Sequence, residues 1–229
     1  MATNLDLEEQ EQLDELKAFW KKYGNPITWV LVIVLGGFAA WNGWGLYQRD
    51  QAAKAASMYD QLDKAAQAAD VDQAARVFAD LKSRYPGTGF TQQAGLALAK
   101  LQFDKAKPDD ALASLTWVEA NATEQEYQTI ARLCAAGVLL DQKKYDEALK
   151  RLDAVVLKDG GAEFGALVED RRGDVLMAQG KADAAKAAYT KAWQAMDAKL
   201  EYRRLVEGKL TALGAPPVVA SAPKAEGAP

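Results

Sequence analysis

Two acidic pairs are the residues best suited to chemistry. Asp109 stands next to Asp110, and Asp146 next to Glu147, 37 residues further along the chain. Adjacent carboxyl groups can serve as general acid and general base when the pKa of one is raised. A hydrolase that uses carboxylates alone requires a deep pocket, and no pattern in the sequence indicates one. At the start of a helix such acids stabilise the helix dipole instead, and we expect this role.

The rest of the composition narrows the catalytic options further. The 229 residues include no histidine and one cysteine, Cys134. Histidine-based triads, zinc sites of His or Cys and a disulfide within the chain are thereby excluded. Cys134 lies in the apolar stretch TIARLCAAGVLL, where we interpret it as a small packing residue rather than a nucleophile. We expect no enzymatic activity and no catalytic, cofactor or metal site.

The charge balance argues against nucleic acid as a partner. The chain has 28 Lys and Arg against 32 Asp and Glu, a net charge of -4. A protein that binds phosphate backbones needs a basic surface, which this composition does not indicate.

An alanine recurs at equal intervals through the polar part of the chain. The four alanines are 37 residues apart and are Ala74, Ala111, Ala148 and Ala185. A large apolar or aromatic side chain follows each of them four positions later. The windows around them are rich in alanine, lack the alternation of strands and are separated by turn residues. The sequence therefore predicts an all-α fold built of repeated helix pairs, in which the alanines mark close helix contacts.

This pattern resembles the tetratricopeptide repeat, in which a small residue early in the second helix lets two helices meet. In the last repeat the family's small and large positions are matched by Gly173, Leu176, Gly180, Ala185, Tyr189 and Ala192. Pro86 supplies the expected stop after the first repeat, whereas Pro108 replaces the aromatic seen at Tyr145. The period exceeds the common 34 residues by about three. The resemblance implies an α-solenoid of about four helix pairs over residues 51–197.

A terminal capping helix should follow the last pair. Its apolar residues are Leu200, Leu205, Leu210 and Leu213. Beyond it, residues 214–229 are so rich in Ala and Pro that we expect a disordered tail.

The first helices of the pairs are expected to line the inner curve of the solenoid. Phe103, Leu140 and Met177 occupy equivalent positions 37 residues apart and would form an apolar stripe. The polar residues expected to border it are Asp63, Lys100, Asp104, Asp141 and Asp174. We predict that this groove binds proteins. The alternative is that neighbouring or terminal helices cover the three apolar residues, which then complete the core.

Residues 27–46 carry no ionisable group. As a helix, such a run spans about 30 Å, the thickness of a bilayer's hydrocarbon core. Trp29 lies near one end and Trp41 and Trp44 near the other, as in interfacial aromatic belts. We predict a retained transmembrane helix over residues 25–48, with Pro26 in its first turn. A cleaved signal sequence and a buried core helix are the alternatives.

The flanks of this span predict its orientation. More basic residues precede the span than follow it, which places the amphipathic segment 1–24 in the cytoplasm and residues 49–213 outside. Within the span, Gly36 with Ala40 and Ala39 with Gly43 form small-xxx-small pairs that allow another transmembrane helix to approach. The alternative is that they reflect only the frequency of glycine in such helices.

The whole layout resembles the YfgM-like family of ancillary SecYEG translocon subunits. The most specific stretch is EEQEQLDELKAFWKKYG, and the repeats LLDQKKYDEALKRLDAV and GDVLMAQGKADAAKAAY extend the resemblance along the chain. It implies a single-pass protein of the bacterial inner membrane with a periplasmic repeat domain. The implied partners are the SecYEG translocon, the membrane-anchored chaperone PpiD, unfolded or emerging periplasmic proteins and the lipid bilayer. The alternative is a scaffold for another envelope machine, such as cytochrome maturation or cell division.

Overall fold

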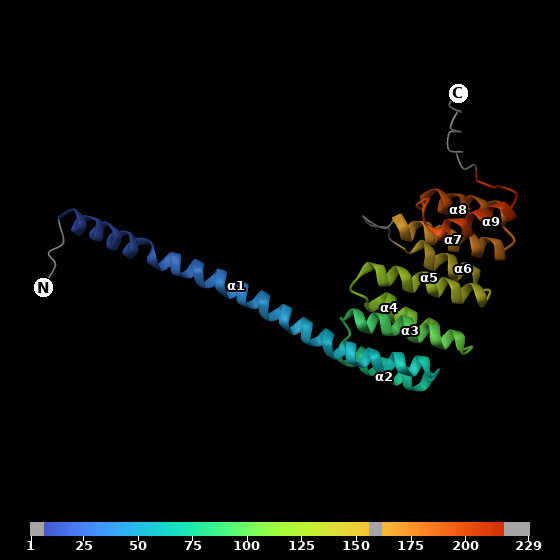
Figure 1. Ribbon diagram of the computed structural model, residues 1–229, viewed down its shortest axis with the longest axis horizontal. Coiled ribbons are helices and arrows are strands. Elements are labelled where there is room, and N and C mark those ends of the chain that lie inside the picture. Colours follow the sequence, from blue (N-terminus) through green and yellow to red (C-terminus); the bar gives the residue numbers. More distant parts are fainter. Residues whose placement is uncertain (1–6, 156–161, 218–229) are drawn as a thin grey trace, which may run out of the picture. The chain divides into compact units, whose positions relative to one another are not determined.

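The computed structural model describes residues 7–155 and 162–217, and the regular elements in these residues are helices (Figure 1). The all-α prediction is confirmed. The helices are α1 (Leu7–Gln67), α2 (Val71–Arg84), α3 (Gly89–Asp104), α4 (Pro108–Asn121), α5 (Gln125–Asp141), α6 (Tyr145–Asp153), α7 (Ala162–Ala178), α8 (Ala182–Ala195) and α9 (Glu201–Ala212). The chain divides into two compact units, Met1–Ala53 and Lys54–Pro229. Of the predicted tail, residues 218–229 lie outside the described residues.

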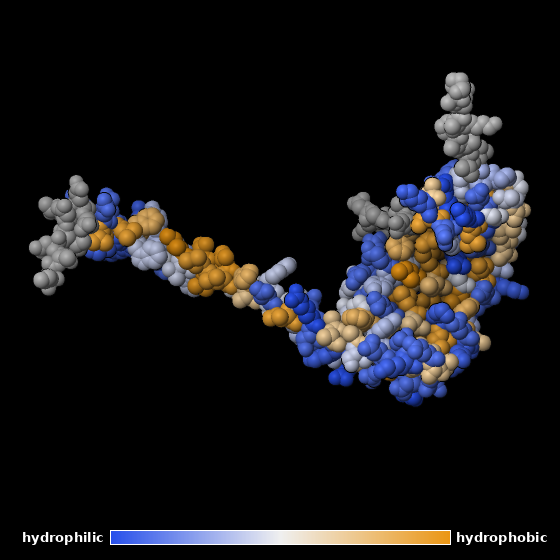
Figure 2. Space-filling view, in the orientation of Figure 1, coloured by the Kyte–Doolittle hydropathy of each residue, from blue (hydrophilic) through white to orange (hydrophobic). Residues whose placement is uncertain are grey.

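The N-terminal unit consists, where it is described, of the first part of α1. Its apolar window has a mean hydropathy of 1.5 and none of that window is buried within the structure, so the buried core helix is ruled out. Large apolar side chains point outward, with Trp41 81% and Ile33 68% exposed. Figure 2 shows this apolar surface along the middle of α1. A helix of this length and composition can cross a membrane.

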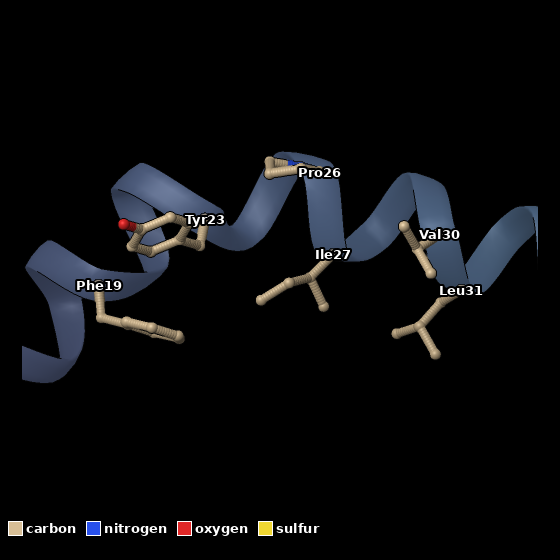
Figure 3. A pocket seen from close by; sticks show the side chains of 6 residues that line it. All are labelled: Phe19, Tyr23, Pro26, Ile27, Val30 and Leu31. Carbon is tan, nitrogen blue, oxygen red and sulfur yellow. The ribbon is translucent and has the colours of Figure 1, made fainter.

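Pro26 differs from the prediction, because it lies inside α1 rather than in a first turn. Proline lacks an N–H group and so removes one hydrogen bond of the helix. Thr28 Oγ1 donates a hydrogen bond to the Gly24 carbonyl oxygen at 2.7 Å, which adds a polar contact beside the proline. Six side chains line an open pocket along this stretch of α1 (Figure 3): Phe19, Tyr23, Pro26, Ile27, Val30 and Leu31.

The second unit, described over residues 54–155 and 162–217, is a stack of helix pairs that we call the solenoid. The pairs are the end of α1 with α2, α3 with α4, α5 with α6, and α7 with α8. Further contacts join α3 to α5 and α5 to α7, so the first helices form a row of their own. Figure 1 shows the pairs following one another in chain order. This is the α-solenoid that the 37-residue interval predicts.

The four repeated alanines occupy equivalent places in the second helices. Each is the fourth residue of its helix, α2, α4, α6 or α8, and each is 0% exposed. A side chain larger than methyl would meet neighbouring helices at these positions, so the equal spacing of the alanines reflects equal helix contacts.

A second 37-residue interval lies in the turns between paired helices. The φ angles are 56° at Ala69, 57° at Ala106, 61° at Lys143 and 76° at Gly180. At the second of these turns, the Ala106 amide donates to the Phe103 carbonyl at 2.9 Å and the Lys107 amide to the Gln102 carbonyl at 2.8 Å. This is the left-handed helix ending that glycine favours, yet three of the four positions carry other residues.

Ala106→Gly is expected to raise the free energy of unfolding by about 0.5–1 kcal/mol, because a left-handed φ is costly for alanine and not for glycine. Urea unfolding of the full chain in detergent, followed by circular dichroism, measures the change. As a matched control, Ala113→Gly at an exposed position inside α4 should lower the stability by about 1 kcal/mol. Equal effects of the two substitutions would contradict the prediction.

The apolar core is divided into four clusters, each made mainly by three consecutive helices: α1 to α3, α3 to α5, α5 to α7 and α7 to α9. In the last cluster α9 buries Val206 and Leu210. Leu200 and Leu205 remain 45% and 53% exposed, so the prediction that they cover the last pair is wrong. The buried face of α9 follows Val206, which lies one residue, or about 100° of helix rotation, away from Leu205.

Candidate functional site

A groove of about 290 Å³ opens on the row of first helices, between α3 and α5. Its lining residues are Leu96, Ala99, Lys100 and Phe103 of α3, Leu115 of α4, Cys134, Gly137, Val138 and Asp141 of α5, and Arg171 of α7. The floor is apolar, and charged groups stand at its edges. Figure 2 shows apolar side chains gathered along the middle of the solenoid between hydrophilic ones.

The structure brings three of the predicted groove residues together in this cavity: Phe103, Lys100 and Asp141. Phe103 is 36% exposed. The Lys100 ammonium lies 2.6 Å from a carboxylate oxygen of Asp104, so Asp104 stands directly beside the groove.

The other predicted groove residues lie elsewhere. Leu140 is half-buried against the cluster of α5, α6 and α7, and Met177 is 38% exposed but does not line the cavity. Asp63 accepts a hydrogen bond from Gln67 at 2.8 Å on α1. Asp174 accepts a hydrogen bond from Lys209 of α9 at 2.7 Å. The structure thus does not join Phe103, Leu140 and Met177 into one stripe in this groove.

Cys134 was interpreted from the sequence as a packing residue, and the structure corrects this: it is exposed and lines the groove. Although part of the side chain is open to solvent, the neighbouring groove side chains desolvate the thiol and raise the pKa of Cys134, while the charge of Arg171 acts in the opposite direction. The sequence carried no signal for this position, because the exposed side of α5 depends on how α3 and α7 pack beside it.

Maleimide is expected to react with Cys134 more slowly than with a free cysteine peptide at neutral pH, since the raised pKa lowers the thiolate fraction. The rate should keep rising at pH values above about 8.5, where a free cysteine is already half ionised. Arg171→Gln should slow the reaction further. Arg172→Gln is the matched control, because that guanidinium pairs with Asp153 at 2.6 Å. A titration midpoint at or below that of the free thiol would contradict the prediction.

Arg171 reaches the groove from α7 and lies opposite Gly137 of α5. Its Nη1 atom lies 3.7 Å from the place where a Cβ on Gly137 would be. The side chain is 39% exposed, and a carboxylate oxygen of Asp174 is 3.8 Å from the guanidinium, beyond hydrogen-bond distance. The sequence prediction did not include Arg171 among the groove residues.

A polar cluster fixes α9 against α7. The Lys209 ammonium lies 2.8 Å and 3.0 Å from the two carboxylate oxygens of Asp170 and 2.7 Å from Asp174. Tyr202 donates to Asp170 at 2.7 Å, and Tyr189 donates to Asp174 at 2.8 Å. Burial, and then the hydrogen bond to the carboxylate, raises the pKa of each tyrosine well above its ordinary value. Both carboxylates are therefore matched by a cation and serve docking of α9 rather than acid–base chemistry.

The acidic pairs of the sequence lie in the first turns of second helices, as expected. Asp109 and Asp110 begin α4, and Asp146 and Glu147 begin α6. Asp109 also accepts a hydrogen bond from Gln142 at 3.0 Å, and Asp146 accepts one from Gln179 at 3.0 Å. These acids thus link successive pairs.

The small residues of the predicted transmembrane helix are exposed on α1: Gly36, Ala39, Ala40 and Gly43. A Cβ added at Gly36 or Gly43 would meet no atom within 4 Å. Their contact with another helix stays a prediction.

Comparison with known proteins shows which proteins this chain resembles. A family model described as a tetratricopeptide repeat-like domain matches residues 17–215. A protein of Neisseria gonorrhoeae named ancillary SecYEG translocon subunit is 33% identical over 211 residues, covering 90% of this chain and 98% of the relative. Proteins with the same name in Haemophilus influenzae and Escherichia coli are 28% and 27% identical, covering 82% and 79% of this chain and 90% and 85% of the relatives.

Proposed function

The chain belongs to the family of ancillary SecYEG translocon subunits, which carry a tetratricopeptide repeat-like domain, and we propose that it is a non-catalytic accessory subunit of that translocon. The observation that carries this proposal is the match to the Neisseria relative over 90% of the chain. An exposed apolar helix in α1 supports anchoring in the membrane, as an accessory subunit of a membrane complex requires.

We propose further that α1 crosses the bacterial inner membrane with its N-terminus in the cytoplasm. The basic residues Lys17, Lys21 and Lys22 precede the apolar window, which is the arrangement that cytoplasmic flanks favour. The solenoid then lies in the periplasm. A periplasm-dependent reporter fused after Pro229 should be active, and activity of a cytoplasm-dependent reporter instead would overturn this orientation.

The small residues of α1 are proposed as a contact with a neighbouring transmembrane helix. Gly36→Ile and Gly43→Ile should then weaken co-purification with the translocon in mild detergent, because close helix approach requires small side chains. Val32→Ile, also exposed on α1, is the matched control. Unchanged co-purification of the glycine variants would overturn this contact.

In the groove between α3 and α5 we place the binding of protein segments. Its apolar floor and charged edges are the features that extended or helical peptides recognise. The proposed ligands are emerging periplasmic polypeptides and the membrane-anchored chaperone PpiD, which the subunit would bring together.

Cys134 provides a direct test, because it is the one cysteine of the chain and lines the groove. A photo-crosslinker attached to its thiol should capture a stalled secretory polypeptide or PpiD in membranes that contain the translocon. The control moves the cysteine to a second helix, by combining Cys134→Ser with Ser83→Cys at an exposed position of α2. Equal capture from both positions would overturn the groove as the binding site. Capture of components of another envelope machine would favour the scaffold alternative.

A further inference from the structure

We propose that Arg171 makes the groove selective for protein segments that carry an acidic side chain beside a large apolar one. This inference rests on the proposed function of the groove as a protein-binding site. It names the chemistry of the segment rather than its source.

Arg171 lies beside a glycine of the neighbouring first helix, Gly137. In the 37-residue frame, the equivalents of Gly137 are Asp63, Lys100 and Asp174, each of which carries a charged side chain. Among these four equivalent positions, the one on α5 thus carries no side chain that could extend toward the next first helix. The Arg171 Nη1 atom lies 3.7 Å from the Cβ position of Gly137, an ordinary van der Waals distance, so a methyl group would fit there and the guanidinium lies directly beside this position.

The hydrogen-bonding state of Arg171 favours a carboxylate ligand. Among the described residues, Asp174 is the acid within 4.0 Å of its guanidinium, at 3.8 Å. That acid already accepts from Lys209 at 2.7 Å and from Tyr189 at 2.8 Å, so its charge is matched without Arg171. A guanidinium has five N–H donors and binds a carboxylate through two of them at once. Arg171 is thus the half-buried cation of the groove that an incoming acid can reach.

The other charged side chains of the groove contribute less to its selectivity for a charged segment. Lys100 is 77% exposed and is held by Asp104 at 2.6 Å. Asp141 is exposed on α5, where water screens its interaction with a ligand. Because solvent weakens both, we expect Arg171 to decide which charge the segment carries.

The preference for a large apolar side chain in the bound segment comes from the floor of the cavity. Phe103 is partly exposed there, with Leu115 and Val138 beneath it. A cavity of about 290 Å³ accepts one large apolar side chain such as leucine or phenylalanine.

Matched fluorescent peptides with one leucine and a nearby Glu, Gln or Lys test the proposal. Their C-termini are amidated, so that the side chain is the variable acid. Binding to the full chain in lipid nanodiscs is measured by fluorescence anisotropy and by protection of Cys134 from maleimide. We expect the Glu peptide to bind about tenfold more tightly than the Gln peptide, and the Lys peptide to bind more weakly still. Arg171→Glu should reverse the order, and Arg171→Gln should abolish it.

Arg172→Gln is the matched control, because that guanidinium pairs with Asp153 and does not line the groove, and it should change the ratio of the Glu and Gln peptide affinities by less than about twofold. Unchanged thermal unfolding of the Arg171 variants establishes that they fold. Equal affinity for the three peptides, with Cys134 protected, would overturn this inference and leave the proposed groove intact. Failure of all the peptides to protect Cys134 would overturn the groove itself.

Discussion

Lys209→Met is expected to lower the free energy of unfolding of the solenoid by about 2–3 kcal/mol and to release α9. The substitution leaves Asp170, whose side chain is 3% exposed, and Asp174 without the ammonium that binds both. Removing one partner of a buried ion pair is costly because the remaining charge stays desolvated. Urea unfolding gives the energy, and amide hydrogen exchange over α9 reports its release.

The exposed Lys191 of α8 supplies the control for this prediction, and Lys191→Met should change the stability by less than about 0.5 kcal/mol. Adding Asp170→Asn and Asp174→Asn to the Lys209→Met chain should recover about 1 kcal/mol or more, since the unmatched charges are then removed. If Lys209→Met and Lys191→Met have the same effect, the cluster does not hold α9.

Ala148→Leu should destabilise the solenoid by about 3 kcal/mol. Ala148 is 0% exposed and packs in the cluster of α5, α6 and α7. An isobutyl group in place of its methyl group must push these helices apart, because interiors are packed without spare volume. Thermal and urea unfolding of the full chain measure the loss.

The equivalent alanine variants extend this second prediction along the chain. Ala111→Leu and Ala185→Leu should cost a similar energy, because both alanines are also 0% exposed. Ala184→Leu, at an exposed position beside the last of them, should change the stability by less than about 0.5 kcal/mol. A loss of equal size at Ala184 would show that helix contacts are not what the repeat preserves.

The helix pairs could be predicted from the sequence because their contacts are local. Each pair meets the pair before and after it, so one small residue per repeat is enough to reveal the architecture. The interval between Ala74, Ala111, Ala148 and Ala185 carries this information directly. The family resemblance could be predicted for the same reason, and the relatives confirm it.

The details of the groove depend on how each helix is rotated about its own axis relative to its neighbours, which no local sequence pattern encodes. Arg171 lines the groove because α7 turns it toward a glycine 34 residues earlier in the sequence. Leu140 shares a repeat position with Phe103, yet it is half-buried against the core cluster of α5, α6 and α7 while Phe103 borders the cavity. Asp170 is buried because a lysine 39 residues later neutralises it. These pairings follow from packing between pairs, which differs from one junction to the next.

The division of the core into four overlapping clusters bears on how the solenoid responds to mechanical load. In the described helices each cluster is made mainly by three consecutive elements, so none joins the first pair to the last. Tension on the C-terminal end would therefore peel the helix hairpins away one after another. Each release would lengthen the molecule by about 12 nm, the contour length of some 37 extended residues. Such a domain would therefore extend in steps under load rather than unfold all at once.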